Sequence, residues 1–110
     1  MHTMRIKRPY YDAIMAGQKT LEVRVGYDNI KRYQAGEIIR LETSEASGTV
    51  KIKAVRTYAS FEDMMAAEGW QKIASDAADT ATALRTIREI YPPEKEALGV
   101  YVFEVEPVSS

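Results

Sequence analysis

A chain of 110 residues, of which 45% are hydrophobic and 28% are charged, has the composition of an ordinary globular protein with one hydrophobic core. We therefore expect a single domain over residues 1–110, and the composition excludes a largely disordered chain. The absence of cysteine excludes disulfides and thiolate metal sites, and the formal net charge of −1 argues against a protein that binds polyanions over its whole surface.

A short amino-terminal strand, predicted at residues 4–8, leads into a predicted helix at residues 9–16. Pro9 suits the first helical position, because its missing N–H would have no partner there. Tyr10, Ala13 and Ile14 lie on one face of this helix.

The chain then turns sharply and continues as a strand. Gly17 follows the predicted helix, at a position where a left-handed C-cap is favourable. Residues 20–25 alternate between apolar and polar side chains, which is the pattern of a half-buried strand. Leu21 should face the core, and Glu22 and Arg24 should share the opposite face.

The remainder of the chain predicts strands interrupted once by helices, an order that indicates an α+β fold. Polar residues 44–48 favour a hairpin turn, Ser60 is a candidate helix cap, and either Asp79 or Thr80 could cap the next helix. Pro92 and Pro93 should end the last helix. The further expected elements are a short helix or irregular crossing at 27–34, strands at 37–43, 49–58 and 99–105, one helix that begins at Ser60, and a second helix that ends at Tyr91.

Three charged residues in the segment 17–24 have a spacing that local folding does not readily explain. Lys19 lies three positions before Glu22 and would therefore point to the opposite face of a regular strand. Lys19, Glu22 and Arg24 can converge only if Lys19 lies in the preceding turn or if a bulge redirects it. The alternative is an edge strand whose Glu–Arg pair is simply solvated.

Charge is distributed unevenly along the chain. Residues 1–40 contain eight Lys/Arg and four Asp/Glu, whereas residues 41–110 contain seven and twelve. A local basic surface in the first part could hold one or a few phosphates although the whole protein is not basic. A chance imbalance among solvated side chains is the alternative.

Other features of the sequence bear on location and cofactors. No apolar run approaches the roughly 20 residues that a membrane-spanning helix needs, and residues 1–7 lack the apolar centre of a signal peptide. We expect a cytoplasmic protein with no membrane partner, and the oligomeric state stays open. His2 is the single histidine and no phosphate-binding glycine loop is present, so we expect neither a metal nor a cofactor.

The spacing Gly17-x-Lys19-x-x-Glu22-x-Arg24 resembles the signature of the ASCH domain family, small relatives of the PUA-like RNA-binding barrels. The resemblance covers nearly the whole chain, from the opening segment to the closing strand. It implies a stand-alone domain with a small PUA-like β-barrel of about five to six strands and flanking helices.

The resemblance implies that RNA or a nucleoside-like molecule binds in a cationic cleft. Lys19 and Arg24 would face phosphate or carbonyl oxygens, and Glu22 would accept a hydrogen bond from a base amino group or a ribose hydroxyl. Tyrosines that flank the basic segment could stack on a base, although most tyrosines simply pack. The expected ligand-binding residues are Gly17, Lys19, Glu22, Arg24, Arg5 and Lys7.

A hydrolase is the alternative function. One branch of the family resembles amidohydrolases that remove acyl groups from the exocyclic nitrogen of cytidine, and Lys19-Thr20 matches their motif. Glu22 stands where that motif has a second threonine, and the downstream catalytic acid aligns near Asp76. Lys19 would polarise the scissile carbonyl and Glu22 would act as general base. Cleavage of RNA by the same cleft is a further alternative.

Overall fold

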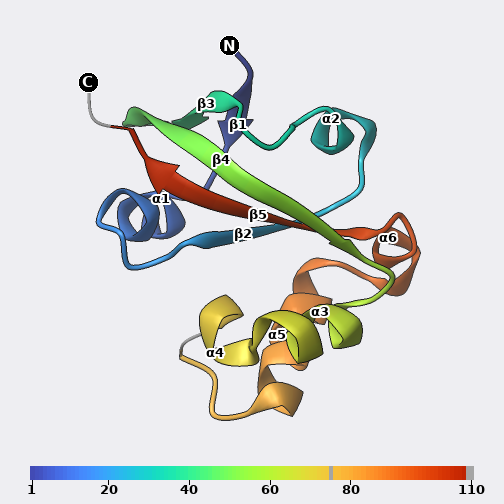
Figure 1. Ribbon diagram of the computed structural model, residues 1–110. Helices are drawn as coiled ribbons and strands as arrows, with labels where there is room; N and C mark the ends of the chain where they lie inside the picture. Colours follow the sequence, from blue (N-terminus) through green and yellow to red (C-terminus); the bar gives the residue numbers. More distant parts are fainter. Residues whose placement is uncertain (75, 109–110) are drawn as a thin grey trace. The chain divides into compact units, whose positions relative to one another are not determined.

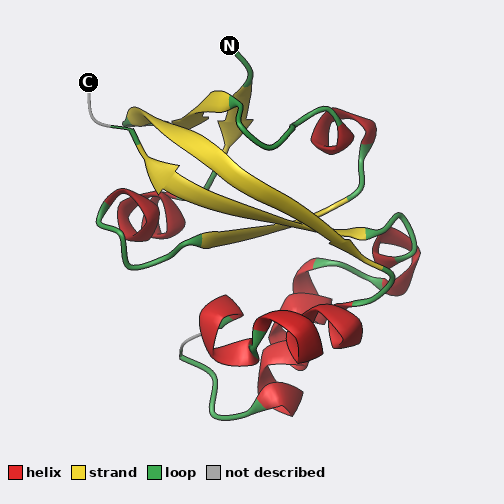
Figure 2. Cartoon of the chain, in the orientation of Figure 1, coloured by secondary structure: helices red, strands yellow, loops and turns green. Residues whose placement is uncertain are grey.

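The computed structural model describes residues 1–74 and 76–108, which form five strands and six helices (Figures 1 and 2). The α+β composition expected from the sequence is confirmed. None of the described helices is long and apolar enough to cross a membrane. The strands are β1 (Thr3–Arg5), β2 (Leu21–Val25), β3 (Ile38–Glu42), β4 (Ser47–Tyr58) and β5 (Val100–Pro107). The helices are α1 (Arg8–Met15), α2 (Asp28–Lys31), α3 (Phe61–Glu68), α4 (Trp70–Ile73), α5 (Thr80–Ile90) and α6 (Pro93–Glu96).

The strands form one sheet in the order β1-β3-β4-β5-β2, so β1 and β2 lie at its two edges. The edge strand β1 pairs in parallel with β3, where Met4 is opposite Leu41. The strands β3 and β4 form the expected antiparallel hairpin, where Ile39 is opposite Val50. This register places buried apolar residues of neighbouring strands on the same face of the sheet.

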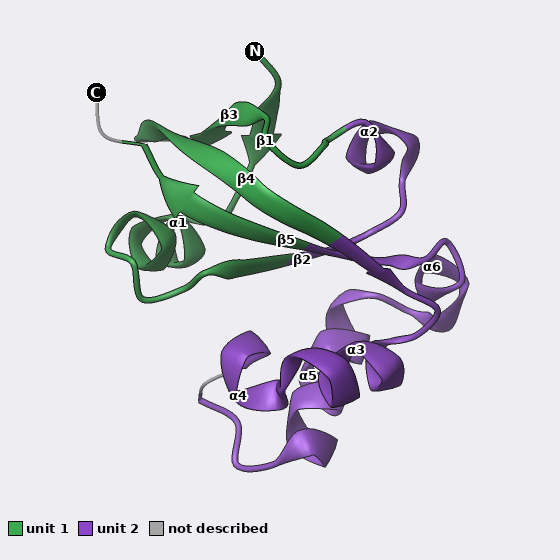
Figure 3. Cartoon of the chain, in the orientation of Figure 1, with its two compact units in different colours: residues 1–22, 33–55, 103–110 green, residues 23–32, 56–102 purple. Residues whose placement is uncertain are grey.

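The chain divides into two compact units, which Figure 3 distinguishes by colour. Unit 1 contains residues 1–22, 33–55 and 103–110, and unit 2 contains residues 23–32 and 56–102. The strands β2, β4 and β5 each pass from one unit to the other. The expectation of a single domain stays a prediction.

Unit 1 packs α1 closely against β4. Ile14 is fully buried and Tyr11 nearly so, whereas Tyr10 is 44% exposed. The buried face of α1 is therefore formed by Tyr11 and Ile14, which are three positions apart, and Tyr10 lies outside it. Gly48 permits this close approach, because a Cβ atom there would lie 2.9 Å from the Cε atom of Met15.

Unit 2 contains most of the helices, and two of its helix starts are capped as the sequence predicts. The Ser60 side chain accepts a hydrogen bond from the backbone N–H of Asp63 at 3.0 Å, and the Asp79 side chain accepts one from Thr82 at 2.8 Å. The four-residue helices α4 and α6 were not predicted, because one turn is too short to show a periodic pattern.

A buried carboxylate also stabilises unit 2. The Glu68 side chain, which is 7% exposed, accepts hydrogen bonds from Nε and Nη2 of Arg56 at 2.6 and 3.0 Å. The hydroxyl of Tyr58 donates a third bond to the same carboxylate. The bonds from Arg56, followed by the bond from Tyr58, hold the pKa of Glu68 below its ordinary value although burial opposes this shift. This arrangement ties the end of α3 to the end of β4.

Candidate functional site

The turn after α1 positions Lys19. Gly17 has φ +77° and ends the helix, as predicted. Its N–H donates to the carbonyl of Ile14, and the Gln18 N–H donates to the carbonyl of Ala13, which is the hydrogen-bond pattern of a Schellman motif. The Lys19 N–H also donates to Ala13, at 3.1 Å. Lys19 is therefore held in the turn, two residues before β2 begins.

This position brings Lys19 and Glu22 together. The Lys19 Nζ atom lies 3.8 Å from Oε1 of Glu22, and the two side chains are 17% and 9% exposed. Glu22 is among the buried polar residues of the chain, so its carboxylate is not part of a solvated outer face. The alternative of a simply solvated Glu–Arg pair is wrong for Glu22.

An aromatic ring covers part of the same lysine. The Nζ atom of Lys19 lies 5.6 Å from the centroid of the Tyr10 ring, within the range of a cation–π interaction. Tyr10 is the exposed tyrosine of α1, so its ring remains accessible while it contacts Lys19. The contact limits the positions that the ammonium group can take.

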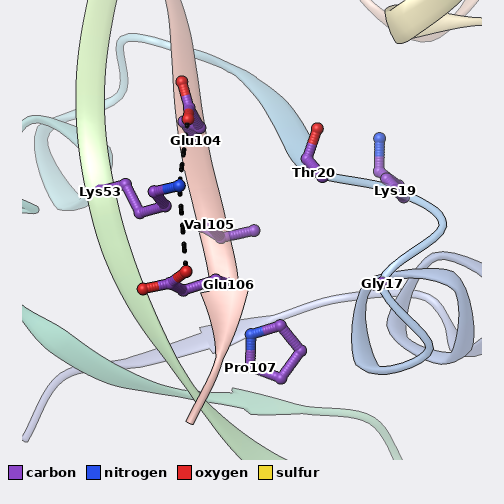
Figure 4. Close-up of a pocket in the computed structure, with 8 residues that line it drawn as sticks. All are labelled: Gly17, Lys19, Thr20, Lys53, Glu104, Val105, Glu106 and Pro107. Carbon is purple, nitrogen blue, oxygen red and sulfur yellow. Dashed lines mark ion pairs between the residues drawn. The ribbon is translucent and has the colours of Figure 1, made fainter.

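A pocket of about 240 Å³ lies next to this lysine, within unit 1. Figure 4 shows Lys19 and Thr20, which precede β2, across from the side chains of β4 and β5. The backbone fixes this arrangement, because the Val105 N–H donates to the Thr20 carbonyl at 2.9 Å. The lining residues are Gly17, Lys19, Thr20, Lys53, Glu104, Val105, Glu106 and Pro107.

The charges in the pocket are mixed. The Nζ atom of Lys53 lies 3.8 Å from Glu104 and 3.9 Å from Glu106, between two carboxylates that alternate along β5 (Figure 4). Both distances are too long for a direct hydrogen bond, and the Lys53 side chain is 48% exposed. Lys53 is thus attracted to both acids without being locked to either, and its ammonium group can turn toward a ligand.

The structure brings together three of the predicted ligand-binding residues. Gly17 and Lys19 both line the pocket, and Glu22 joins them through its ion pair with Lys19. Arg24 is half-buried in the part of β2 that belongs to unit 2, so its convergence with Lys19 stays a prediction.

The other predicted residues lie elsewhere. Arg5 is in β1, where its guanidinium forms a 3.0 Å ion pair with Glu42, and Lys7 is exposed just before α1. Neither is among the described residues that line the pocket. Asp76 is exposed in the turn between α4 and α5, in unit 2, and its catalytic role stays a prediction.

Three charged pocket residues, Lys53, Glu104 and Glu106, were missed by the sequence-based prediction. Each lies on a predicted strand, where an alternating charged residue looks like an ordinary solvated side chain. The sequence pattern that could have predicted these residues is the alternation of two lysines in Lys51-x-Lys53 and of two acids in Glu104-x-Glu106. This pattern predicts ion pairs only when β4 and β5 are known to be neighbours in the sheet.

Comparisons with known proteins agree with this structure. The family model of the ASCH domain matches residues 4–109. The crystal structure of hypothetical protein PH0355 has 29% sequence identity and a TM-score of 0.84, and the match covers 96% of this chain and 97% of that chain. The solution structure of protein PF0455 from Pyrococcus furiosus has 24% identity and a TM-score of 0.78, with 99% and 98% covered.

A third structure has the same fold at lower identity. The crystal structure of a ZmASCH mutant from Zymomonas mobilis shares 13% identity with a TM-score of 0.69, and the match covers 96% of this chain and 68% of that chain. No match is found among the curated proteins. The expected α+β class with a small PUA-like β-barrel is confirmed, and the chain belongs to the ASCH domain family.

Proposed function

We propose that this ASCH domain binds RNA or a nucleoside-like molecule in the pocket beside Lys19. The observation that carries the proposal is the position of the Lys19 side chain, which lines the pocket and lies 3.8 Å from the buried Glu22. A cationic donor and an anionic acceptor are thus held at one place by the Gly17 turn. The membership of the ASCH family supports the same function.

The chemistry of the pocket fits one nucleoside-sized group. Its volume of about 240 Å³ is below the range of about 300–1,000 Å³ that is usual for drug-sized ligands. The Lys19 ammonium can donate to a phosphate or carbonyl oxygen, and the Thr20 hydroxyl can donate or accept. Glu104 and Glu106 can accept hydrogen bonds from an amino or hydroxyl group, which a bare phosphate does not offer.

The same pair of residues supports the hydrolase alternative. A carboxylate can act as a general base when it is held at a fixed position, and the ion pair with Lys19 positions the buried Glu22 in this way. Lys19 would polarise the carbonyl of an N-acylated cytidine or a phosphoryl group of RNA. Asp76 is retained as the proposed third residue of this activity.

Binding of the four ribonucleosides and of a short single-stranded oligoribonucleotide, measured by calorimetry or fluorescence anisotropy, tests the proposal. Lys19→Ala removes a charged hydrogen-bond donor and should weaken binding by about 10- to 100-fold, because such a bond contributes about 1.5–3 kcal/mol. Lys31→Ala, which removes an exposed lysine of α2, is the matched control and should bind as the wild type does. Equal affinity of the wild type and Lys19→Ala would refute the site.

Glu22→Gln gives a second, isosteric test. The amide keeps the shape of the side chain but loses the negative charge, so the ligand loses its anionic acceptor and Lys19 loses its ion pair. Glu89→Gln, on the exposed face of α5, removes an equal charge and serves as the control. A loss of affinity in both variants would point to net charge and not to the pocket.

A further inference from the structure

One face of the sheet in unit 1 carries a pair of cations that no ion pair neutralises. Arg40 in β3 and Lys51 in β4 are both exposed, and no described acidic side chain forms an ion pair with either. The other exposed cations of this face have partners: Arg5 pairs with Glu42, and Lys53 lies between two glutamates. Among the described residues of this face, Arg40 and Lys51 are therefore the cations without an ion pair, and the acid across from Lys51 is Glu106 of β5, as the 3.0 Å hydrogen bond from the Val108 N–H to the Thr49 carbonyl sets the register of β4 and β5.

The strand register places the two cations beside each other. Arg40 is opposite Thr49, and Lys51 is the next residue of β4 on the same face, so the two form a diagonal cross-strand pair. Diagonal neighbours are about 7–8 Å apart at their Cα atoms. Like charges at this distance oppose folding slightly, so Arg40 gains no stability for the sheet from its neighbour Lys51.

Hydroxyl groups flank the arginine on both sides. Arg40 is opposite Thr3 of β1 and opposite Thr49 of β4, which gives the row Thr3, Arg40, Thr49 across three strands. Arginine, lysine and threonine side chains are the usual donors to phosphate oxygens in complexes with nucleic acids. Ile38, which is opposite Lys51 and 45% exposed, adds an apolar contact at the same place.

The face that carries Arg40 and Lys51 continues along β4 to the pocket. Lys53, which lines the pocket, follows Lys51 by two residues and therefore points to the same side of β4. A chain whose base or nucleoside occupied the pocket would have its neighbouring phosphates close to Lys51 and Arg40. A free nucleoside would not reach these residues.

We propose that the outer face formed by Thr3, Arg40, Thr49 and Lys51 binds the phosphates of single-stranded RNA adjacent to the nucleotide held in the pocket. The inference rests on the proposed function and adds a second contact region to it. The occupant is a polyanion with regularly spaced phosphates, because two cations flanked by hydroxyl donors complement such a backbone. With two charges, the face accounts for about two phosphate contacts.

The test compares two double variants of equal net charge. Arg40→Gln with Lys51→Gln removes the pair, and Lys31→Gln with Arg85→Gln removes two exposed cations of unit 2 as the control. A short mixed-sequence oligoribonucleotide, the four ribonucleosides and poly-glutamate are the probes. Circular dichroism and thermal unfolding establish that both variants fold.

For the Arg40/Lys51 variant we expect about 25-fold weaker binding of the oligoribonucleotide at 0.1 M salt. The slope of log affinity against log salt should also be about 1.4 smaller, because each phosphate contact on a single strand contributes about 0.7. Its affinity for ribonucleosides should equal that of the wild type, and the control variant should match the wild type with every probe.

Each result that differs from these expectations would exclude a different part of the two proposals. Equal oligoribonucleotide binding by the two double variants, with ribonucleoside binding intact, would overturn the phosphate face but leave the pocket. A wild-type protein that binds neither ribonucleosides nor RNA would overturn both proposals. An equal loss of binding to poly-glutamate would assign the face to an acidic protein partner and overturn its assignment to RNA.

Discussion

The Lys19 ammonium lies 3.8 Å from the Glu22 carboxylate although a regular strand would place the two residues on opposite faces. The conflict is resolved because Lys19 is not in the strand: its N–H bonds to the carbonyl of Ala13, in the last turn of α1, and β2 begins two residues later. Gly17 makes this turn with a positive φ that other residues rarely adopt. Gly17 therefore contributes to the site by positioning Lys19.

Substitution of Gly17 should separate positioning from stability. Gly17→Ala introduces a Cβ atom with no neighbour within 4 Å, so its cost is the strain of a positive φ, about 1 kcal/mol or slightly more. Gly36 is a matched control, because its φ is +89° and its surroundings are equally open. Both variants should lose similar stability in urea unfolding, but only Gly17→Ala should also weaken ligand binding. Equal binding by the two variants would contradict the positioning role of Gly17.

Lys53 should determine how much a phosphate group on the ligand changes its affinity for the pocket. Lys53→Ala leaves Glu104 and Glu106 without their shared cation, so the pocket becomes more negative. We expect a nucleoside 5′-monophosphate to lose about tenfold in affinity, the effect of one charged contact, and the parent nucleoside to lose much less. Lys53→Arg keeps the charge and should restore nucleotide binding. An equal loss for nucleotide and nucleoside would show that Lys53 does not face the phosphate.

Much of this fold follows from local patterns in the sequence. Ser60 and Asp79 cap their helices as predicted, and the turn at Gly17 and the β3–β4 hairpin form where expected. These features depend on a few consecutive residues, whose side chains and backbone angles favour one local structure.

What the sequence did not reveal depends on contacts between distant segments. The parallel pairing of β1 with β3 joins residues about 37 positions apart, and no local pattern specifies it. The meeting of Lys53 with Glu104 likewise depends on which strands are neighbours. The burial of Glu22 also requires the surrounding fold, since alternation alone predicted an outward-facing residue.

Stability at acidic pH should depend on Glu68. The hydrogen bonds from Arg56, and then from Tyr58, lower the pKa of Glu68 in the folded state, so the unfolded chain binds more protons as the pH falls. The contribution of Glu68 is fully present above the ordinary pKa of about 4.3 and is lost as the pH falls through the lower folded value. Burial raises the pKa of Tyr58, so its hydroxyl remains a donor at neutral pH.

Glu68→Gln should therefore destabilise the protein at neutral pH, by about 1–3 kcal/mol once the partial exposure of Arg56 is taken into account, and should flatten the acid limb of the stability curve. Urea unfolding at pH 7 and at several values below pH 5 measures both effects. Glu62→Gln is the control: the Glu62 side chain is 66% exposed in its pair with Arg88, and its loss should change stability little. An unchanged acid limb in Glu68→Gln would contradict the assignment.

Hydrolysis is the remaining alternative, and Lys19 and Glu22 give it a direct test. If the pocket hydrolyses N-acylated cytidine or single-stranded RNA, Lys19→Ala should abolish turnover, because alanine cannot polarise a carbonyl or phosphoryl group. Glu22→Gln should lower the rate at least about a hundredfold, the usual scale for a positioned acid–base group. Asp76→Asn should have a comparable effect if Asp76 is the third residue, and Asp63→Asn, on α3, is its matched control. Chromatography of the wild-type reaction with each substrate separates the alternatives: product formation that depends on Lys19 and Glu22 would identify a hydrolase, whereas binding without product would leave the ASCH domain as a binding module for these ligands.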